Sequence, residues 1–313
     1  MSGQKYRLVT RSDFDGLVCA VLLRSLDLID EITFVHPKDV QDGAVEVTER
    51  DILTNLPYAA DAHIVFDHHH SETLRNTGGR KNHVINENAP SAARVVYEYY
   101  GGAEAFPQVS DELMTAVDQA DSARYELHDI LDPQGWALLN FIMDSRTGLG
   151  RFRDFRVSNY QLMMQLIDEV LRQDSVEEIL GLPDVAERVQ LYRRQSELFV
   201  EQLHRVSDAR GDLVVVDLRD EEVIHAGNRF MIYALFPECR VSAHVLWGRM
   251  KQNTVIAVGK SILDRTSPVD IGALCLRYGG GGHENAGTCQ VPHEETEQTL
   301  QEIVAAVNEP AKV

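Results

Sequence analysis

The chain has 313 residues, room for about two domains, and its 44% hydrophobic and 25% charged content is ordinary for a globular protein. Its formal net charge of −19 argues against binding to long nucleic-acid duplexes, which depends on many lysine and arginine contacts to phosphates. The four cysteines (Cys19, Cys239, Cys275 and Cys289) form no CxxC pair, which argues against a zinc knuckle or a disulfide framework and is typical of a reducing cytosol.

The sequence shows no segment that predicts targeting or membrane insertion. The longest early apolar run, Leu17 to Leu23, is far shorter than the roughly 20 residues that span a bilayer. It also follows Asp13 and Asp15, which are foreign to a signal peptide. We therefore expect a cytoplasmic protein with no membrane partner.

The first half of the chain alternates short apolar strands with helices. The helix expected after the first strand is apolar nearly all round, and the helix after Pro90 ends at two glycines, which are typical start and stop signals. This alternation predicts a parallel sheet covered by helices on both faces. The expected strands are Tyr6–Thr10, Glu31–Val35 and His63–Phe66, and the expected helices are Gly16–Leu28 and Ser91–Tyr100.

The second half begins with helical periodicity and then returns to strands. We predict an α/β fold with a parallel-sheet domain over residues 1–184, a helical linker over 185–211 and a smaller α/β domain over 212–313. The linker contains an expected helix over Val185–His204. After it, the expected strands are Leu213–Leu218, Arg240–Trp247 and Thr254–Val258, and the expected helices are Pro268–Tyr278 and Thr296–Asn308.

The run Asp13-Phe14-Asp15-Gly16 follows the first predicted strand and precedes the buried helix. Ligands of doubly wound sheets bind outside the carboxyl ends of the strands, where this pair of carboxylates is expected. Two aspartates on one tight loop can each face a cation. The alternative is a helix N-cap followed by a glycine, which explains one aspartate better than two.

The run Asp67-His68-His69-His70 follows another predicted strand. Packing does not account for three histidines in a row after an apolar strand. Imidazole is the commonest metal ligand in proteins, and a neighbouring carboxylate often fixes its tautomer. This run therefore predicts a metal site.

A third motif, Gly279-Gly280-Gly281-Gly282-His283, follows a predicted helix near the C-terminus. Successive glycines let backbone N–H groups converge on an anion, so the run favours an anion site over the alternative, a flexible linker. Other polar residues are weaker candidates, because ordinary solvent exposure explains them equally well. Asp51 could end a strand or cap a turn, and Asp118 and Asp121 could lie at a solvated helix end. A cluster of arginines could bind phosphate or form a charged surface turn: Arg146, Arg151, Arg153 and Arg156.

In this order, the motifs resemble the DHH phosphoesterase superfamily with its DHHA1 C-terminal domain. Asp67-His68-His69 together with Gly280-Gly281-Gly282-His283 is the specific part of the resemblance, which covers nearly the whole chain. The superfamily includes exopolyphosphatases, nanoRNases, cyclic-dinucleotide phosphodiesterases and single-strand exonucleases. The resemblance implies a metal-dependent phosphohydrolase with a parallel-sheet catalytic domain and a smaller substrate-binding domain.

The resemblance also implies roles for individual residues around Mn²⁺ or Mg²⁺, as one or two ions. Asp13 would ligate the first ion, Asp15 and His68 the second, and Asp51 would bridge the two. Asp121 would be the last ligand, with Asp118 as the fallback. The candidate catalytic residues are His69, which would face the substrate phosphate, Asp67, which would orient His68, and Arg11, which is considered below. Gly280, Gly281, Gly282 and His283 would hold the rest of the substrate, helped by Lys260 and Ser261.

One position departs from the family pattern. Arg11 stands where the first motif usually has a histidine, and a protonated guanidinium cannot donate a lone pair to a metal. The first metal site therefore loses a ligand unless His70 or water replaces it. Arg11 could instead grip a phosphate oxygen.

The main hypothesis is a hydrolase that acts on short phosphoanhydride or phosphodiester substrates. Polyphosphate is favoured slightly, because Arg146-Thr147-Gly148-Leu149-Gly150-Arg151 resembles proteins described as exopolyphosphatase-related. The first alternative is a phosphodiesterase for nanoRNA, a short oligonucleotide or a linear dinucleotide. The second is a regulatory protein that binds a nucleotide or phosphate at a degenerate site, and a homodimer is left open.

Overall fold

The structure, a computed structural model, describes residues 4–69, 80–152, 154–173 and 175–309. The chain divides into two compact units. Unit 1 comprises residues 1–124, 134–145 and 149–190, and unit 2 comprises residues 125–133, 146–148 and 191–313. Unit 2 thus takes two short segments from the stretch assigned to the first domain. The long helix α10 (Pro183–Val206) runs from unit 1 into unit 2, where a connecting helix is predicted.

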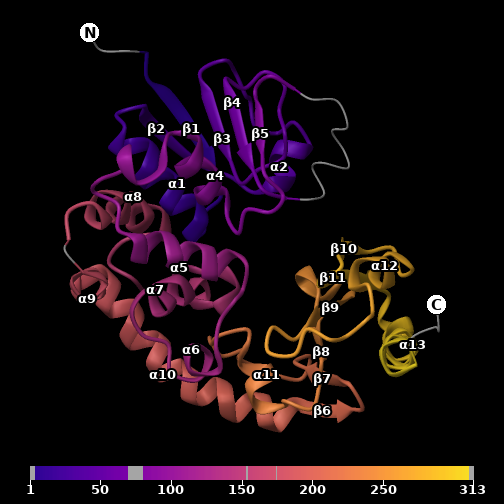
Figure 1. Cartoon of the computed structure of the whole chain (residues 1–313). Helices are drawn as coiled ribbons and strands as arrows, with labels where there is room; N and C mark the ends of the chain where they lie inside the picture. The colour runs from indigo at the N-terminus through magenta and orange to yellow at the C-terminus, as the bar shows by residue number, and fades with distance from the viewer. Residues whose placement is uncertain (1–3, 70–79, 153, 174, 310–313) are drawn as a thin grey trace. The chain divides into compact units, whose positions relative to one another are not determined.

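Unit 1 is built on a five-stranded sheet in the order β2-β1-β3-β4-β5, and all four strand pairs are parallel (Figure 1). The predicted parallel sheet is therefore confirmed. The short strands β3 and β5 escaped prediction, because each contains only two apolar residues. The strands are β1 (Tyr6–Thr10), β2 (Ile29–Phe34), β3 (Asp51–Thr54), β4 (Ile64–Asp67) and β5 (His83–Ile85).

Helices cover this sheet. Helix α1 is buried over its first ten residues, as its all-round apolar sequence predicts, and it packs against α4, α5 and α8. A second cluster, around Val9, Leu53 and Val65, is covered by Val40 of α2 and by the segment that contains Tyr58. The described helices of unit 1 are α1 (Phe14–Ser25), α2 (Pro37–Gln41), α4 (Ala92–Tyr99), α5 (Asp111–Asp121), α7 (Gly135–Met143), α8 (Asn159–Val170) and α9 (Val176–Gly181).

Unit 2 is built on a six-stranded mixed sheet in the order β10-β11-β9-β8-β7-β6. Its core joins apolar residues of β7, β8, β9 and β11 to those of α12 and α13. The strands are β6 (Ser207–Arg210), β7 (Leu213–Asp217), β8 (Val241–Trp247), β9 (Thr254–Lys260), β10 (Gly281–His283) and β11 (Ala286–Val291). The helices are α6 (Leu127–Leu131), α11 (Met231–Leu235), α12 (Ile271–Leu276) and α13 (Thr296–Asn308).

The predicted fold class, α/β with a parallel-sheet unit and a second α/β unit, is confirmed. Ser207–Arg210, at the end of the predicted helical linker, forms a strand instead of continuing the helix. None of the helices within the described residues combines the length and the apolar character that crossing a membrane requires.

Candidate metal and phosphate site

The carboxyl ends of β1, β3 and β4 lie at one edge of the unit 1 sheet, because the three strands are parallel neighbours. The register pairs Val9 with Leu53 and Thr54 with Phe66, so the residues that follow these strands leave the sheet side by side. Open parallel sheets bind their ligands at this edge. The predicted motifs Asp13–Gly16 and Asp67–His69 both lie there.

The two aspartates of the first motif have different environments at the start of α1. Asp13 is the N-cap, and its Oδ1 accepts a hydrogen bond of 3.0 Å from the backbone N–H of Gly16. Gly16 is needed because a Cβ there would collide with the backbone carbonyl oxygen of Arg11. Asp15 is 2% exposed and accepts hydrogen bonds from the backbone N–H groups of Ala93 (2.8 Å) and Ala92 (3.1 Å). The capping interpretation thus accounts for Asp13 and leaves Asp15 unexplained.

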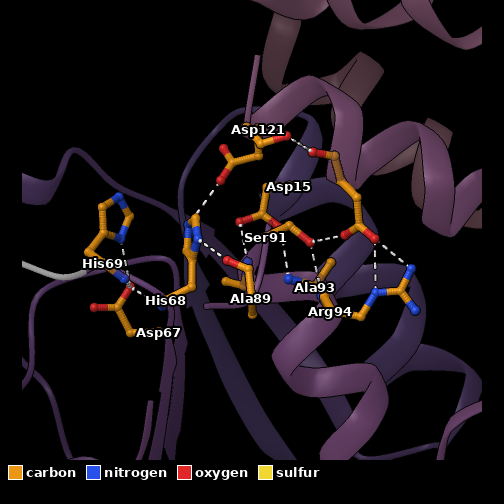
Figure 2. Close-up of polar contacts among 12 residues, drawn as sticks. Asp15, Asp67, His68, His69, Ala89, Ser91, Ala93, Arg94 and Asp121 are labelled. Carbon is orange, nitrogen blue, oxygen red and sulfur yellow. Dashed lines mark hydrogen bonds and ion pairs between the residues drawn. The ribbon is translucent and has the colours of Figure 1, made fainter. Parts of the chain in front are cut away.

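Asp15, His68 and Asp121 bring their side chains together (Figure 2). One ligand atom from each lies within 4.8 Å of the other two. His68 Nε2 lies 2.9 Å from Asp121 Oδ2, while its Nδ1 lies 3.2 Å from the carbonyl oxygen of Ala89. A carbonyl oxygen only accepts, so Nδ1 carries a proton and Nε2 faces the carboxylates. Of the two aspartates considered on α5, the structure brings Asp121 into this cluster.

Electrostatics in this cluster favour a positive charge. Burial and the nearby charge of Asp121 raise the pKa of Asp15 well above its usual value. Burial opposes protonation of His68, but the carboxylates around it, Asp121 above all, outweigh burial and raise the pKa of its imidazole to about 9. Burial also acts against ionised Asp121, yet His68 holds the pKa of that carboxyl below its usual value. The buried carboxylate of Asp15, the partly exposed carboxylate of Asp121 and one imidazole thus stabilise a cation between them.

Asp67 orients His69 and not His68, which corrects the role that the resemblance implies. Asp67 Oδ1 lies 2.7 Å from His69 Nδ1 and accepts the backbone N–H of His68 at 2.9 Å. Asp67 is fully buried, and within the described part of the chain its Oδ2 has no hydrogen-bond partner. The side chain of His69 is 42% exposed, and Asp67 holds its Nδ1, so Nε2 is the ring nitrogen left for a ligand. His70 lies outside the described residues.

Arg11 forms an ion pair with Asp13. Its Nε lies 3.0 Å from Asp13 Oδ2, the carboxylate oxygen that does not cap α1. Arg11 directly follows β1, so it lies at the carboxyl edge of the sheet, and about a third of its side chain is exposed. Asp13 lies two residues before Asp15 but is not among the three clustered ligands.

The bridging role implied for Asp51 is wrong. Asp51 begins β3, where it pairs with Arg7 of β1, so it lies at the amino-terminal edge, opposite the cluster. Its carboxylate is buried and receives hydrogen bonds from Arg7 Nε (2.6 Å), Arg7 Nη2 (2.8 Å) and the backbone N–H of Thr48 (2.7 Å). These bonds satisfy it within the fold.

Asp118, the fallback ligand, is also structural. Its carboxylate accepts hydrogen bonds from Ser91 Oγ (2.7 Å) and Arg94 Nε (2.9 Å) at the start of α4. Asp118 therefore secures the helix whose first N–H groups bind Asp15. It belongs to the support of the site and not to its ligands.

Asn55 is a residue that the sequence analysis missed. It follows β3, so the register places it between the residues that follow β1 and β4. Its side chain is buried, and within the described residues neither its amide nitrogen nor its amide oxygen has a hydrogen-bond partner. Each unsatisfied buried polar atom costs about 1–3 kcal/mol, so this amide is suited to a ligand. A polar residue directly after an apolar strand was the signal in the sequence.

The glycine run in unit 2 forms part of a strand pair. Gly281–His283 is β10 and pairs antiparallel with β11, so the flexible-linker interpretation is wrong. The backbone N–H of Gly280 donates to the carbonyl oxygen of Cys275 at 3.0 Å and is therefore taken up within the fold. A Cβ at Gly280 would collide with the backbone of Thr288. Close packing thus explains a glycine at position 280, and the anion site stays a prediction.

Lys260 and Ser261 lie beside this hairpin, because the backbone N–H of Lys260 donates to the carbonyl oxygen of Asn285. The Lys260 side chain is 5% exposed, and its amine lies 3.2 Å from a carboxylate oxygen of Glu284. Ser261 Oγ accepts hydrogen bonds from the backbone N–H groups of Leu263 (3.2 Å) and Asp264 (3.1 Å). Both side chains therefore have partners within the fold.

The donor set of the cluster fits a divalent cation. It offers carboxylate oxygens from two aspartates and one imidazole nitrogen, and contacts outside the cluster hold two of the three side chains, Asp15 and His68. Sites with mostly oxygen ligands and one imidazole favour Mn²⁺ or Mg²⁺, whereas structural zinc sites are typically rich in thiolates. Asp15, His68 and Asp121 are therefore the residues of unit 1 that would hold the ion.

Comparison with known proteins identifies relatives among solved structures. The chain is 58% identical to a pGpG-specific phosphodiesterase, PggH from Vibrio cholerae, over 97% of this chain and 99% of that one, with a TM-score of 0.86. RecJ from Thermus thermophilus, solved with Mn²⁺, is 16% identical over 97% of this chain and 52% of that one, with a TM-score of 0.52. CDC45 from Entamoeba histolytica is 10% identical over 97% and 95% of the two chains, with a TM-score of 0.51.

No protein-family model matches the chain, and neither does any curated protein sequence. The likenesses to RecJ and CDC45 show the fold alone. The match to the phosphodiesterase covers almost both chains at an identity that shows common family membership. Together with the cluster at the carboxyl edge of the sheet, it shows that this chain is a phosphohydrolase and belongs to the DHH phosphoesterase superfamily.

Proposed function

We propose that the protein is a phosphodiesterase that hydrolyses the linear dinucleotide pGpG at its internal phosphodiester bond. One water would be consumed, and two guanosine monophosphates would be released. The observation that carries this proposal is the 58% identity, across nearly the whole chain, with a phosphodiesterase specific for pGpG. This supports the dinucleotide alternative better than the polyphosphate reading that the arginine-rich segment favoured.

The residues of unit 1 have complementary roles in this proposal. Asp15, His68 and Asp121 would bind the cation, Mn²⁺ or Mg²⁺, and α4 and Ala89 keep two of these ligands in place. A bound cation would supply Lewis acidity to the phosphoryl group. His69 would direct its Nε2 at a phosphoryl oxygen, because Asp67 holds its Nδ1.

The segment that suggested polyphosphate has a structural explanation. Thr147 is buried, and its carbonyl oxygen accepts a hydrogen bond of 3.0 Å from the backbone N–H of Gly227, so the segment secures a loop of unit 2. Arg153, from the same cluster of arginines, lies outside the described residues. For unit 2 we keep the proposal that Gly280, Gly281, Gly282, His283, Lys260 and Ser261 bind the remainder of the substrate. A cytoplasmic location and a homodimer also stay predictions.

The test compares substrates on the purified full chain with Mn²⁺, with Mg²⁺ and with a chelator. Chromatography would follow the release of guanosine monophosphate from pGpG, and a colorimetric assay would follow phosphate from polyphosphate. We expect metal-dependent cleavage of pGpG, slower cleavage of other linear dinucleotides and of short RNA, and no release from polyphosphate. Faster release of phosphate from polyphosphate than of nucleotide from pGpG would contradict the proposal.

A further inference from the structure

The metal-ligating side chains at the carboxyl edge of the unit 1 sheet form one cluster in the part of the chain that the structure describes. That cluster consists of Asp15, His68 and Asp121. Both carboxylate oxygens of the nearest other aspartate, Asp13, already have partners. Oδ1 caps α1 through the N–H of Gly16, and Oδ2 pairs with Arg11.

The groups beside Asp13 are unsuited to a second cation. Arg11 carries a permanent positive charge, has no lone pair to donate, and lies 3.0 Å from Asp13. A cation bound at Asp13 would have to displace this guanidinium. Asn55, which follows β3 between the ends of β1 and β4, offers a neutral amide oxygen, which binds a divalent cation more weakly than a carboxylate does.

We infer that this site holds a single divalent cation, on Asp15, His68 and Asp121, and that Arg11 supplies the second positive charge. Held by Asp13, the guanidinium contacts a non-bridging oxygen of the scissile phosphate. Its remaining N–H groups suit this contact, because a planar guanidinium donates in a fork that matches phosphate oxygens. The role of Arg11 rests on the proposed phosphodiesterase activity, whereas the number of cations does not.

The cation count is tested on the wild-type chain. The protein is saturated with Mn²⁺ and desalted, its bound manganese is measured by mass spectrometry, and its electron paramagnetic resonance spectrum is recorded. We expect one manganese per chain and the six-line spectrum of isolated ions. Two ions per chain with an exchange-coupled spectrum would overturn the inference, as would the absence of any retained ion.

A double variant, Arg11→His with Asn55→Asp, tests why the second ion is excluded. It places an imidazole and a carboxylate at the carboxyl edge of the sheet, so we expect it to retain a second manganese. The matched control is Arg50→His, at an exposed ion pair with Asp30, which should retain one. If the double variant is as stable as the wild type, with the same temperature of unfolding, and still binds a single ion, then Arg11 and Asn55 are not what excludes the second cation. If it does not fold, the wild-type count still decides the inference.

The phosphate contact is tested with Arg11→Gln on the manganese-loaded enzyme. We expect kcat/KM for pGpG to fall roughly 100-fold, as when one charged donor to a transition state is removed, with the manganese count unchanged. Unchanged kcat/KM would overturn the role of Arg11. A wild-type chain that binds one ion but leaves pGpG intact would refute the proposed substrate alone. Cleavage of pGpG by a chain with two ions would refute only the inference.

Discussion

Two buried aspartates occupy opposite edges of the same parallel sheet, and their partners differ. Asp51, at the amino-terminal edge, is satisfied by the guanidinium of Arg7 and the N–H of Thr48. Asp15, beyond the carboxyl edge, is as deeply buried but receives only backbone N–H groups and faces the carboxylate of Asp121 and the imidazole of His68. The charge of Asp51 is therefore compensated by groups of the chain itself, whereas the environment of Asp15 favours binding of a cation from solution.

This comparison separates a structural carboxylate from a ligand-binding one. Both are nearly inaccessible to solvent, so burial alone does not distinguish them. Burying a carboxylate is costly unless a positive charge or hydrogen bonds compensate. The distinguishing feature is the source of the compensating positive charge, which is Arg7 for Asp51 and a bound cation for Asp15.

The largest effect is expected for Asp15→Asn. Loss of one anionic ligand weakens the cation site and removes several kcal/mol of transition-state stabilisation, so kcat/KM should fall on the order of 1000-fold. The temperature of unfolding of the metal-free protein should change little, because relief from the charge of Asp121 offsets the loss of one acceptor for the N–H groups of Ala92 and Ala93. Kinetics and thermal unfolding measure the two quantities. Asp168→Asn, on the exposed partner of Arg24, is the matched control.

Asp51→Asn should have the opposite profile. It leaves the guanidinium of Arg7 without its buried partner, so the free energy of unfolding should drop by about 3 kcal/mol. At a temperature where the variant is folded, kcat/KM should stay within about twofold of wild type, because metal chemistry does not reach this edge. Chemical denaturation and steady-state kinetics provide the measurements. An inactive but stable variant would place Asp51 in the site after all.

Asp67→Asn should give an intermediate effect on turnover. The substitution weakens the contact that orients His69, so we expect kcat to fall roughly 100-fold while retention of manganese changes little. His68 keeps its contact with the carbonyl oxygen of Ala89 in this variant. Loss of bound metal comparable to that in His68→Ala would show instead that Asp67 serves the cation.

The smallest expected effect is on the pH dependence of the stability that Asp51 contributes at the amino-terminal edge of the sheet. Burial alone would raise the pKa of Asp51, but hydrogen bonds from Arg7 and Thr48 outweigh it and hold this pKa below its usual value. A carboxylate with a depressed folded-state pKa contributes stability above its unfolded pKa of about 3.9, and this contribution is lost as pH falls through the folded pKa. The difference in free energy of unfolding between wild type and Asp51→Asn should therefore shrink below about pH 4. Denaturant titrations at several pH values measure this difference. A difference that stays constant from neutral pH to below pH 4 would contradict the prediction.

The sequence by itself determined the fold class and most elements of the chain. Short apolar runs predict β1 and β4, and a buried helix is expected directly after β1 from its all-round apolar composition. It also marked Asp13–Gly16 and Asp67–His69, because polar residues directly after buried strands come together at one edge of a parallel sheet. Hydrophobic periodicity is a local property, so these features needed no knowledge of strand pairing.

Only the tertiary structure decided which polar side chains at that edge meet. Asp51 begins the short strand β3 and Asn55 follows it, and the choice of Asp51 as a ligand came from the family resemblance. The register between β1, β3 and β4 reverses that choice, since it places Asp51 beside Arg7 and Asn55 at the carboxyl edge. Likewise, Asp118 and Asp121 lie on one helix, and packing against α4 directs one to Arg94 and the other to His68. Strand register and helix orientation arise from long-range packing, which a local pattern does not contain.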